Sequence, residues 1–250
     1  MVVGLNRIRE AFSGFEDSYV VIGGTACEII MRSNRRRFRM TKDIDMVLIV
    51  EGRLAEFGHV LENFITSGGY ENWQKNDSGP HFYRFLHPHV PDYPVMVELF
   101  SSHPLFPLKA DHGITPIHFA DDITSLSAIM LDPSYYELMN QGRETLDGVS
   151  ILGEGYLIPF KAKAWLDLLE RRESGIHVDS KNIKKHRNDV LLLTDLLSPQ
   201  ASIPLSSEVK SDMGMFLDRL REEDLPLKDL GLDDETPEGI IGKLRGIYGC

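Results

Sequence analysis

One stretch constrains the fold more than any other, YVVIGGTACEIIMRSNRRRFRMTKDIDMVLIV, which begins at Tyr19. Its two ends, residues 19–22 and 46–50, are short apolar runs rich in Val and Ile, as expected of buried strands. After the first run come Gly23 and Gly24, which permit a tight turn and let the backbone approach a ligand closely. The sequence therefore predicts a strand, a glycine turn, a helix and a second strand in one unit.

The second predicted strand follows an acidic triplet, Asp43-Ile44-Asp45. Side chains two residues apart on a strand share a face, so the two carboxylates point the same way. Carboxylates held side by side repel each other unless a cation lies between them. Mg²⁺ prefers oxygen ligands and is often held by one or two carboxylates together with substrate phosphates. An acidic pair beside a glycine turn therefore indicates phosphoryl or nucleotidyl transfer.

This combination of residues resembles the nucleotidyltransferase superfamily that includes DNA polymerase β. The longer pattern GGTA…RMTKDID is similar to the branch that contains the AbiEii/AbiGii toxins of abortive-infection and toxin–antitoxin systems. The resemblance implies that Asp43 and Asp45 bind Mg²⁺ or Mn²⁺ and that a nucleoside triphosphate (NTP) is the substrate. It also implies that small and hydroxyl residues of the pattern contact the NTP, namely Gly23, Gly24, Thr25 and Thr41. The spacer before the acidic triplet is longer here than is usual in the family.

Glu98 lies in an otherwise apolar run, PVMVELFS, which has the pattern of a strand. A carboxylate among hydrophobic neighbours is costly to bury unless it is paired or bound to a metal. In the superfamily a third acidic residue on a later strand acts as a base or metal ligand, and the resemblance gives this role to Glu98. The alternative is that strand alternation sends Glu98 to the solvent side of an edge strand.

Two lysines, Lys161 and Lys163, lie in the helical segment FKAKAW. In the toxin-like relatives a lysine near the start of such a helix contacts the NTP, and a compact ammonium group suits phosphate. The two lysines are about 200° apart around a helix, so they do not both face one cleft. Lys161 shares a face with Ala164, Trp165 and Leu168, which favours Lys161 as the buried one. Lys163 fits a solvent-exposed position at least as well.

The segment KKHRNDV of a later predicted helix offers a further candidate, Asp189. The relatives carry a basic residue followed by acidic positions in a corresponding helix, and Asp189 matches the later acid. The earlier acid is absent here. An ordinary polar cluster on a helix surface accounts for the segment nearly as well.

Basic residues crowd the spacer that leads into the acidic triplet: Arg32, Arg35, Arg36, Arg37, Arg39 and Lys42. Such a segment can attract phosphate groups or an RNA acceptor. The alternative is a solvated loop whose charge offsets the neighbouring acids.

Apolar periodicity and capping residues predict the remaining elements. Helices are expected at 5–15, 25–32, 54–67, 133–141, 160–172 and 180–197, from Ser206 or Ser207 to Arg221, and from Thr236 to Tyr248. Further strands are expected at 81–87, 94–101, 125–131 and 149–152. With the resemblance, this order predicts an α/β (α+β) fold. A nucleotidyltransferase domain with a mixed sheet flanked by helices spans 1–153, and a smaller helical domain spans 154–250.

The composition excludes several classes of protein. The chain has 250 residues and a formal net charge of −11, which argues against a general nucleic-acid coat protein. Its two cysteines, Cys27 and Cys250, form no disulfide framework and no metal-binding spacing, which fits a reducing compartment. Neither a secretory signal nor an apolar run of membrane-spanning length is evident. We therefore expect a cytoplasmic protein without a membrane partner.

Together these features predict metal-dependent transfer of a nucleoside monophosphate from an NTP to an acceptor, with release of pyrophosphate. The acceptor stays open among RNA such as tRNA, a protein and a small molecule, and the resemblance adds a cognate antitoxin to the partners to be sought. The main alternative is a nucleotide-binding regulatory or interaction protein that does not catalyse. An enzyme would label an acceptor from a labelled NTP, whereas a binding protein would only retain the nucleotide.

Overall fold

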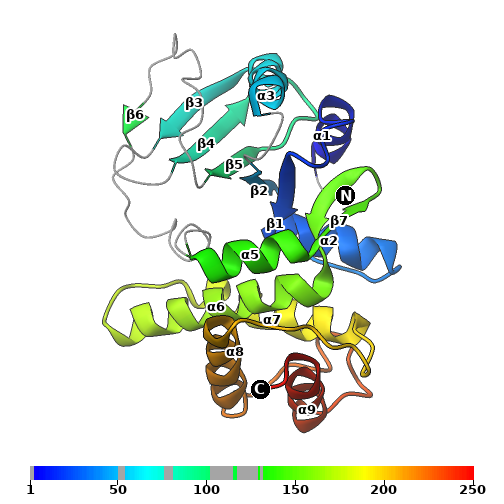
Figure 1. Cartoon of the computed structure of the whole chain (residues 1–250). Helices are drawn as coiled ribbons and strands as arrows, with labels where there is room; N and C mark the ends of the chain where they lie inside the picture. The colour runs from blue at the N-terminus through cyan, green and yellow to red at the C-terminus, as the bar shows by residue number, and fades with distance from the viewer. Residues whose placement is uncertain (1–2, 50–53, 76–80, 102–114, 117–128, 130–131) are drawn as a thin grey trace. The chain divides into compact units, whose positions relative to one another are not determined.

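The computed structural model describes residues 3–49, 54–75, 81–101, 115–116, 129 and 132–250 (Figure 1). The chain divides into two compact units, one of residues 1–119 and 143–152 and the other of residues 120–142 and 153–250. The single division predicted at residue 153 places residues 120–142 in the first domain, whereas the structure places them in the second unit. The reason is local packing, because the helix at the end of this segment contacts helices that follow residue 153.

The first unit is built on a mixed sheet, in which the described strands run in the order β6-β3-β4-β5-β2-β1-β8-β7 (Figure 1). The strands are β1 (Tyr19–Ile22), β2 (Asp43–Leu48), β3 (Tyr70–Lys75), β4 (His81–Pro88), β5 (Met96–Ser101), β6 (Thr115–Pro116), β7 (Arg143–Leu146) and β8 (Val149–Leu152). β2 pairs in parallel with β5, β1 with β8, and β3 with β6. The other neighbours are antiparallel. The predicted mixed sheet is confirmed.

Three described helices accompany the sheet: α1 (Leu5–Ala11), α2 (Gly23–Ser33) and α3 (Leu54–Gly68). α2 follows β1 directly and contacts both β1 and β2, while α1 and α3 contact each other. The ring of Phe12, just after α1, lies 5.4 Å from Tyr19, 5.2 Å from Phe57 and 5.2 Å from Phe64 between centroids. All four rings are buried. Burial of each such ring stabilises the fold by about 1.5–3 kcal/mol, so this cluster fixes β1 and α3 together.

The second unit is helical, as predicted, with α5 (Pro133–Gln141), α6 (Glu154–Glu173), α7 (Ser180–Leu196), α8 (Ser207–Leu220) and α9 (Pro237–Tyr248) (Figure 1). α6 contacts α5, α7 and α8, so it is the central helix of this unit. In four of these five helices the side chain of the N-cap residue accepts a hydrogen bond from a backbone N–H of the first turn. The four N-cap residues are Asp132, Asp179, Ser206 and Thr236. These caps satisfy donors that the first turn of a helix leaves unpaired.

A proline inside α6 is accommodated by the last helix. Pro159 has no N–H, so the carbonyl oxygen of Gly155 lacks its usual partner four residues ahead. The hydroxyl of Tyr248 in α9 donates to this oxygen at 2.5 Å. α6 starts six residues before the predicted position at 160, and α9 supplies the hydrogen bond that the proline removes.

Three described strands are absent from the sequence-based prediction: β3, β6 and β7. β7 forms a hairpin with β8 through Asp147 and Gly148, whose φ angles are +52° and +70°. An Asp-Gly pair with both residues in the left-handed region is a strong signal for a two-residue hairpin turn. The predicted strand at 125–131 lies outside the described residues except for Ile129. None of the described helices combines the length and the hydropathy that a membrane-spanning helix requires.

Candidate active site

Asp43 and Asp45 begin strand β2 and lie on one face of the sheet, with Ile44 on the opposite face. Asp43 is exposed and Asp45 is half-buried, whereas Ile44 and the rest of the strand are buried. The apolar part of β2 thus anchors the strand in the core. The two carboxylates stand at the point where the strand emerges from it.

The glycine turn lies directly against this acidic pair. Gly23 has a φ of +69°, a left-handed conformation that glycine adopts without strain. A Cβ atom on Gly23 would lie 2.0 Å from Oδ2 of Asp45, so only glycine leaves room for this carboxylate. A Cβ atom on Gly24 would lie 2.9 Å from Cγ2 of Thr41 and 3.1 Å from a guanidinium nitrogen of Arg39. An anionic group and a cationic group therefore both approach the backbone at the start of α2.

A buried polar network connects α2 to the residues before β2. Thr25 Oγ1 donates to the carbonyl oxygen of Asp43 at 2.6 Å. Oε2 of Glu28 accepts from the backbone N–H of Thr41 at 3.1 Å and from its hydroxyl at 2.8 Å. Thr25, Glu28 and Thr41 are all buried. The network holds the acidic triplet in place, so Thr25 and Thr41 act here as positioning residues, and their predicted contact with an NTP stays a prediction.

Glu98 lies in β5 directly opposite Asp45 of β2 in a parallel pairing, so the two side chains share a face of the sheet. On its other side Glu98 lies opposite Arg84 of β4. Nε and Nη2 of Arg84 contact Oε1 of Glu98 at 2.6 and 2.5 Å. β5 lies between β4 and β2 and the Glu98 side chain is 12% exposed, so the edge-strand alternative does not hold. Catalysis and metal binding by Glu98 remain predictions.

The donor set on this face fits Mg²⁺ or Mn²⁺. Asp43 and Asp45 supply the hard oxygen donors that these ions prefer, and Asp45 lies in a cradle that a Cβ on Gly23 would fill. Across the described part of the chain, no three His, Cys, Asp or Glu side chains are arranged to hold a metal ion. Two carboxylates that share an ion with substrate phosphates match the usual way in which proteins hold Mg²⁺.

The basic spacer forms an exposed segment beside this site. Its six cationic residues, Arg32, Arg35, Arg36, Arg37, Arg39 and Lys42, are all exposed. The guanidinium of Arg39 lies 5.0 Å from the centroid of the Phe38 ring. The segment leads without interruption into Asp43. Strong positive charge is therefore present next to the acidic pair.

Lys161 and Asp189 form a buried ion pair between α6 and α7 of the second unit. Nζ of Lys161 lies 2.8 Å from Oδ2 of Asp189, and both side chains are 2% exposed. Lys161 thus occupies the buried face of α6 that its spacing favours. Each of these two candidates for NTP binding has the other as a partner, and their contact with an NTP stays a prediction.

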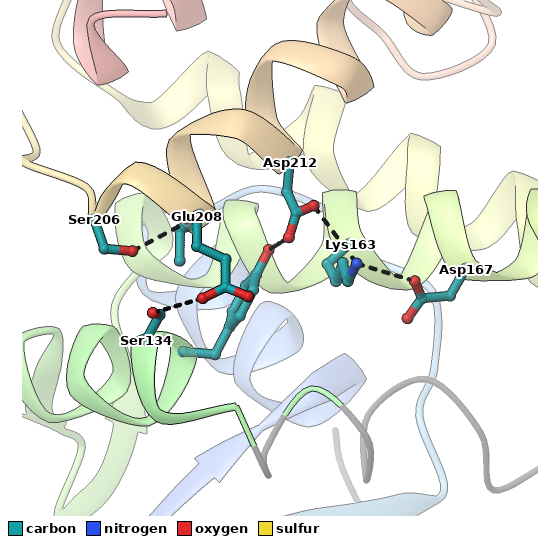
Figure 2. Close-up of polar contacts among 8 residues, drawn as sticks. Ser134, Lys163, Asp167, Ser206, Glu208 and Asp212 are labelled. Atoms are coloured by element: carbon teal, nitrogen blue, oxygen red, sulfur yellow. Dashed lines mark hydrogen bonds and ion pairs between the residues drawn. The ribbon is translucent and has the colours of Figure 1, made fainter.

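Lys163 lies on the more exposed face of α6, within the polar network of Figure 2. Its Nζ lies 3.4 Å from Asp167 and 3.5 Å from Asp212, and Tyr135 donates its hydroxyl to Asp212 at 3.0 Å. Burial lowers the pKa of Lys163, but the attraction of Asp167 and Asp212 outweighs it and the pKa is raised. Lys163, Asp167 and Tyr135 also line a cavity of about 500 Å³ in the second unit.

Comparison with known proteins gives similarity to solved structures alone. No protein-family model matches the chain, and no curated protein matches it. Its fold is similar to those of solved structures. One of these is a crystal structure of an antigenic nucleotidyltransferase-like protein from Paracoccidioides brasiliensis, with 14% sequence identity and a TM-score of 0.43 over 100% of both chains. With so few identical residues and this TM-score, we draw no functional conclusion from the similarity.

Four charged residues of these networks did not stand out in the sequence: Glu28, Arg84, Asp167 and Asp212. Asp212 follows a serine, whereas Glu28, Arg84 and Asp167 are each flanked by apolar residues within a helix or strand, as in ACEIIM, HFYRFLH and AWLDLL. A charged side chain in such a position is costly to bury without a partner. This is the signal that would have identified Glu28, Arg84 and Asp167, although it does not reveal the partner.

Proposed function

We propose that the chain is a metal-dependent nucleotidyltransferase that moves a nucleoside monophosphate from an NTP to an acceptor. The observation that carries this proposal is the position of Asp43 and Asp45 on one face of β2, with Asp45 held against the backbone of Gly23. This arrangement provides ligands for a divalent cation and an adjacent backbone turn for phosphate. The predicted motif and its geometry thus support the same chemistry.

The reaction forms a bond between an acceptor hydroxyl oxygen and the α-phosphorus and breaks the bond from that phosphorus to pyrophosphate. A bound Mg²⁺ or Mn²⁺ would neutralise charge on the phosphates and orient them. Asp43 and Asp45 would hold the ion, and Thr25, Glu28 and Thr41 would keep the two carboxylates in place. Gly23 and Gly24 would receive the phosphate tail. Glu98 would accept the proton of the acceptor hydroxyl or bind a second ion.

The acceptor is proposed to approach from the basic spacer. The six exposed cations of residues 32–42 favour an anionic acceptor such as RNA, because phosphates bind to clustered arginine and lysine. A protein or small-molecule acceptor is the alternative. The proposal of a toxin-like role with a cognate antitoxin is supported by the amino-acid sequence of the motif alone, GGTA…RMTKDID.

A second candidate function is nucleotide binding without catalysis. Two observations favour it: Arg84 pairs with Glu98, and Lys161 pairs with Asp189. In that case the acidic pair and the glycine turn would retain a nucleotide, and the output would be an interaction with a partner protein.

Incubation of the full chain with each NTP labelled at the α-phosphate, Mg²⁺ or Mn²⁺, and an extract of RNA and protein separates the two functions. The enzyme is expected to transfer label to an acceptor, and Asp43→Asn with Asp45→Asn is expected to abolish transfer. The matched control is Asp233→Asn with Asp234→Asn, which removes the same charge from an exposed loop. Retention of NTP without any labelled acceptor would favour the binding protein. If the variant with Asp43→Asn and Asp45→Asn labels an acceptor as well as the control does, the assignment of Asp43 and Asp45 to the active site is contradicted.

A further inference from the structure

Three charged side chains lie in a row across three neighbouring strands of the sheet. Arg84 in β4 pairs with Glu98 in β5, and Glu98 pairs with Asp45 in β2. Residues directly opposite each other in neighbouring strands point to the same face. A permanent cation is therefore present on the same face as the acidic pair, one strand beyond the third carboxylate.

The contact between Arg84 and Glu98 is close and poorly hydrated. Nε and Nη2 of Arg84 both contact Oε1 of Glu98, at 2.6 and 2.5 Å. The two side chains are only 18% and 12% exposed, so water and salt screen the pair weakly. Charge-assisted hydrogen bonds of this kind are about twice as strong as neutral ones. Arg84 thus neutralises the carboxylate that would serve as a third ligand.

We propose that Arg84 is a built-in counter-ion that competes with a divalent cation for Glu98. The inference rests on the proposed metal site at Asp43 and Asp45. The acidic pair takes the first ion, and Glu98 contributes to metal binding only when it exchanges Arg84 for a cation. The guanidinium keeps the third carboxylate stable and dehydrated when metal is absent. It also sets the metal concentration at which Glu98 joins the site.

An alternative role for Arg84 predicts the opposite change in metal affinity when Arg84 is removed. If Arg84 only orients Glu98 toward a metal, loss of Arg84 weakens metal binding, by about 10–100-fold for groups that orient ligands. If Arg84 competes, its loss strengthens metal binding. Two cations compete for one carboxylate, so removal of the poorly exposed guanidinium leaves the charge of Glu98 available to a metal ion.

The test is calorimetric titration of Mn²⁺ into the full chain without nucleotide. We compare the wild type with Arg84→Met, which keeps the length of the side chain, and with Arg84→Lys, which keeps its charge. Arg84→Met is expected to bind Mn²⁺ at least about 10-fold more tightly or to bind an additional ion. Arg84→Lys is expected to stay near the wild type. The gain is expected to disappear in Arg84→Met with Glu98→Gln.

Unchanged or weaker Mn²⁺ binding by a folded Arg84→Met protein would overturn the proposal, and so would a gain that persists with Glu98→Gln. Arg84→Gln replaces Arg84→Met in the same titration if the methionine variant does not fold, because glutamine removes the charge but can still donate to Glu98. Failure of the proposed function is distinguishable. If the proposed metal site is wrong, the variant with Asp43→Asn and Asp45→Asn, which keeps Arg84, binds Mn²⁺ as the wild type does.

Discussion

Glu98 lies directly opposite Asp45 in the parallel pairing of β5 with β2. The two carboxylates belong to residues 53 positions apart in the sequence, and the sheet brings them to the same face. Glu98 is held there by Arg84 rather than exposed to solvent. Three acidic residues thus share one face of the sheet, and one of them, Glu98, is paired with an arginine of the neighbouring strand.

Glu98→Gln is expected to bind NTP nearly as well as the wild type but to lose at least about 100-fold in transfer rate, because a base acts mainly in the transition state. Glu144→Gln, in the exposed strand β7, is the matched control and is expected to behave as the wild type. The measurements are NTP affinity by calorimetry and single-turnover transfer. A wild-type transfer rate in Glu98→Gln would remove Glu98 from the catalytic site.

The sequence predicted the acidic face well because its signals are local. The alternation around Ile44 fixes the shared direction of Asp43 and Asp45, and the two glycines mark the start of α2. The position of Glu98 needed only the assumption that its strand lies beside β2. The partner of Glu98 was not predictable, since Arg84 reaches it through strand order and register, which a single sequence does not specify.

The Lys161–Asp189 pair makes a prediction about stability. Lys161→Met is expected to lower the free energy of unfolding by about 3–5 kcal/mol, because it leaves the buried Asp189 charge without this lysine. Adding Asp189→Asn is expected to restore part of the loss, because it removes the charge. Lys163→Met, at a lysine that is 30% exposed, is expected to cost less. Urea unfolding measures all three, and equal losses for Lys161→Met and Lys163→Met would contradict the assignment of the buried pair.

The network at Glu28 predicts a coupled effect on stability and on the site. Glu28→Ala leaves the buried N–H and hydroxyl of Thr41 without their acceptor, which is expected to cost about 1–3 kcal/mol. The acidic triplet then loses its support, so Mn²⁺ and NTP affinity are expected to fall as well. Glu28→Gln keeps an acceptor oxygen and is expected to have the smaller effect on both. Unchanged ligand affinity in a destabilised Glu28→Ala protein would show that the network does not position the triplet.

Asp167 predicts a dependence of stability on pH. Burial, the largest cause, raises the pKa of Asp167 above its ordinary value of 3.8, against the opposing attraction of Lys163. Protonation therefore favours the folded state, and this contribution is full below 3.8 and lost as the pH rises through the raised pKa. Asp167→Asn is thus expected to gain stability relative to the wild type as the pH rises from about 4 to neutral. Unfolding free energies across this range check the sign, with exposed Asp233→Asn as control, and a constant difference would contradict it.

Capping residues explain why the helices of the second unit were easier to predict than the ion pairs between them. Pro133, Ser206 and Thr236 mark helix starts locally, so the ends of α5, α8 and α9 follow from a few neighbouring residues. The ion pairs of Lys161 and Lys163 depend on which helices pack together. The same limit applies to α5, which belongs to the second unit because of packing against α6 rather than because of its place in the chain.

The central claim is that Asp43 and Asp45 hold a divalent ion that an NTP shares. The most direct measurement is thermal unfolding of the full chain with NTP, with Mn²⁺, and with both, in the wild type and in Asp43→Asn with Asp45→Asn. Ligand at about 100 times its Kd stabilises a folded protein by about 2.7 kcal/mol. The account predicts that NTP and Mn²⁺ together stabilise the wild type by more than the sum of their separate effects, because each ligand strengthens the binding of the other. It also predicts that the double variant unfolds at the wild-type temperature without ligands and shows no such gain. A well-folded double variant that keeps the full metal-dependent stabilisation would contradict the account.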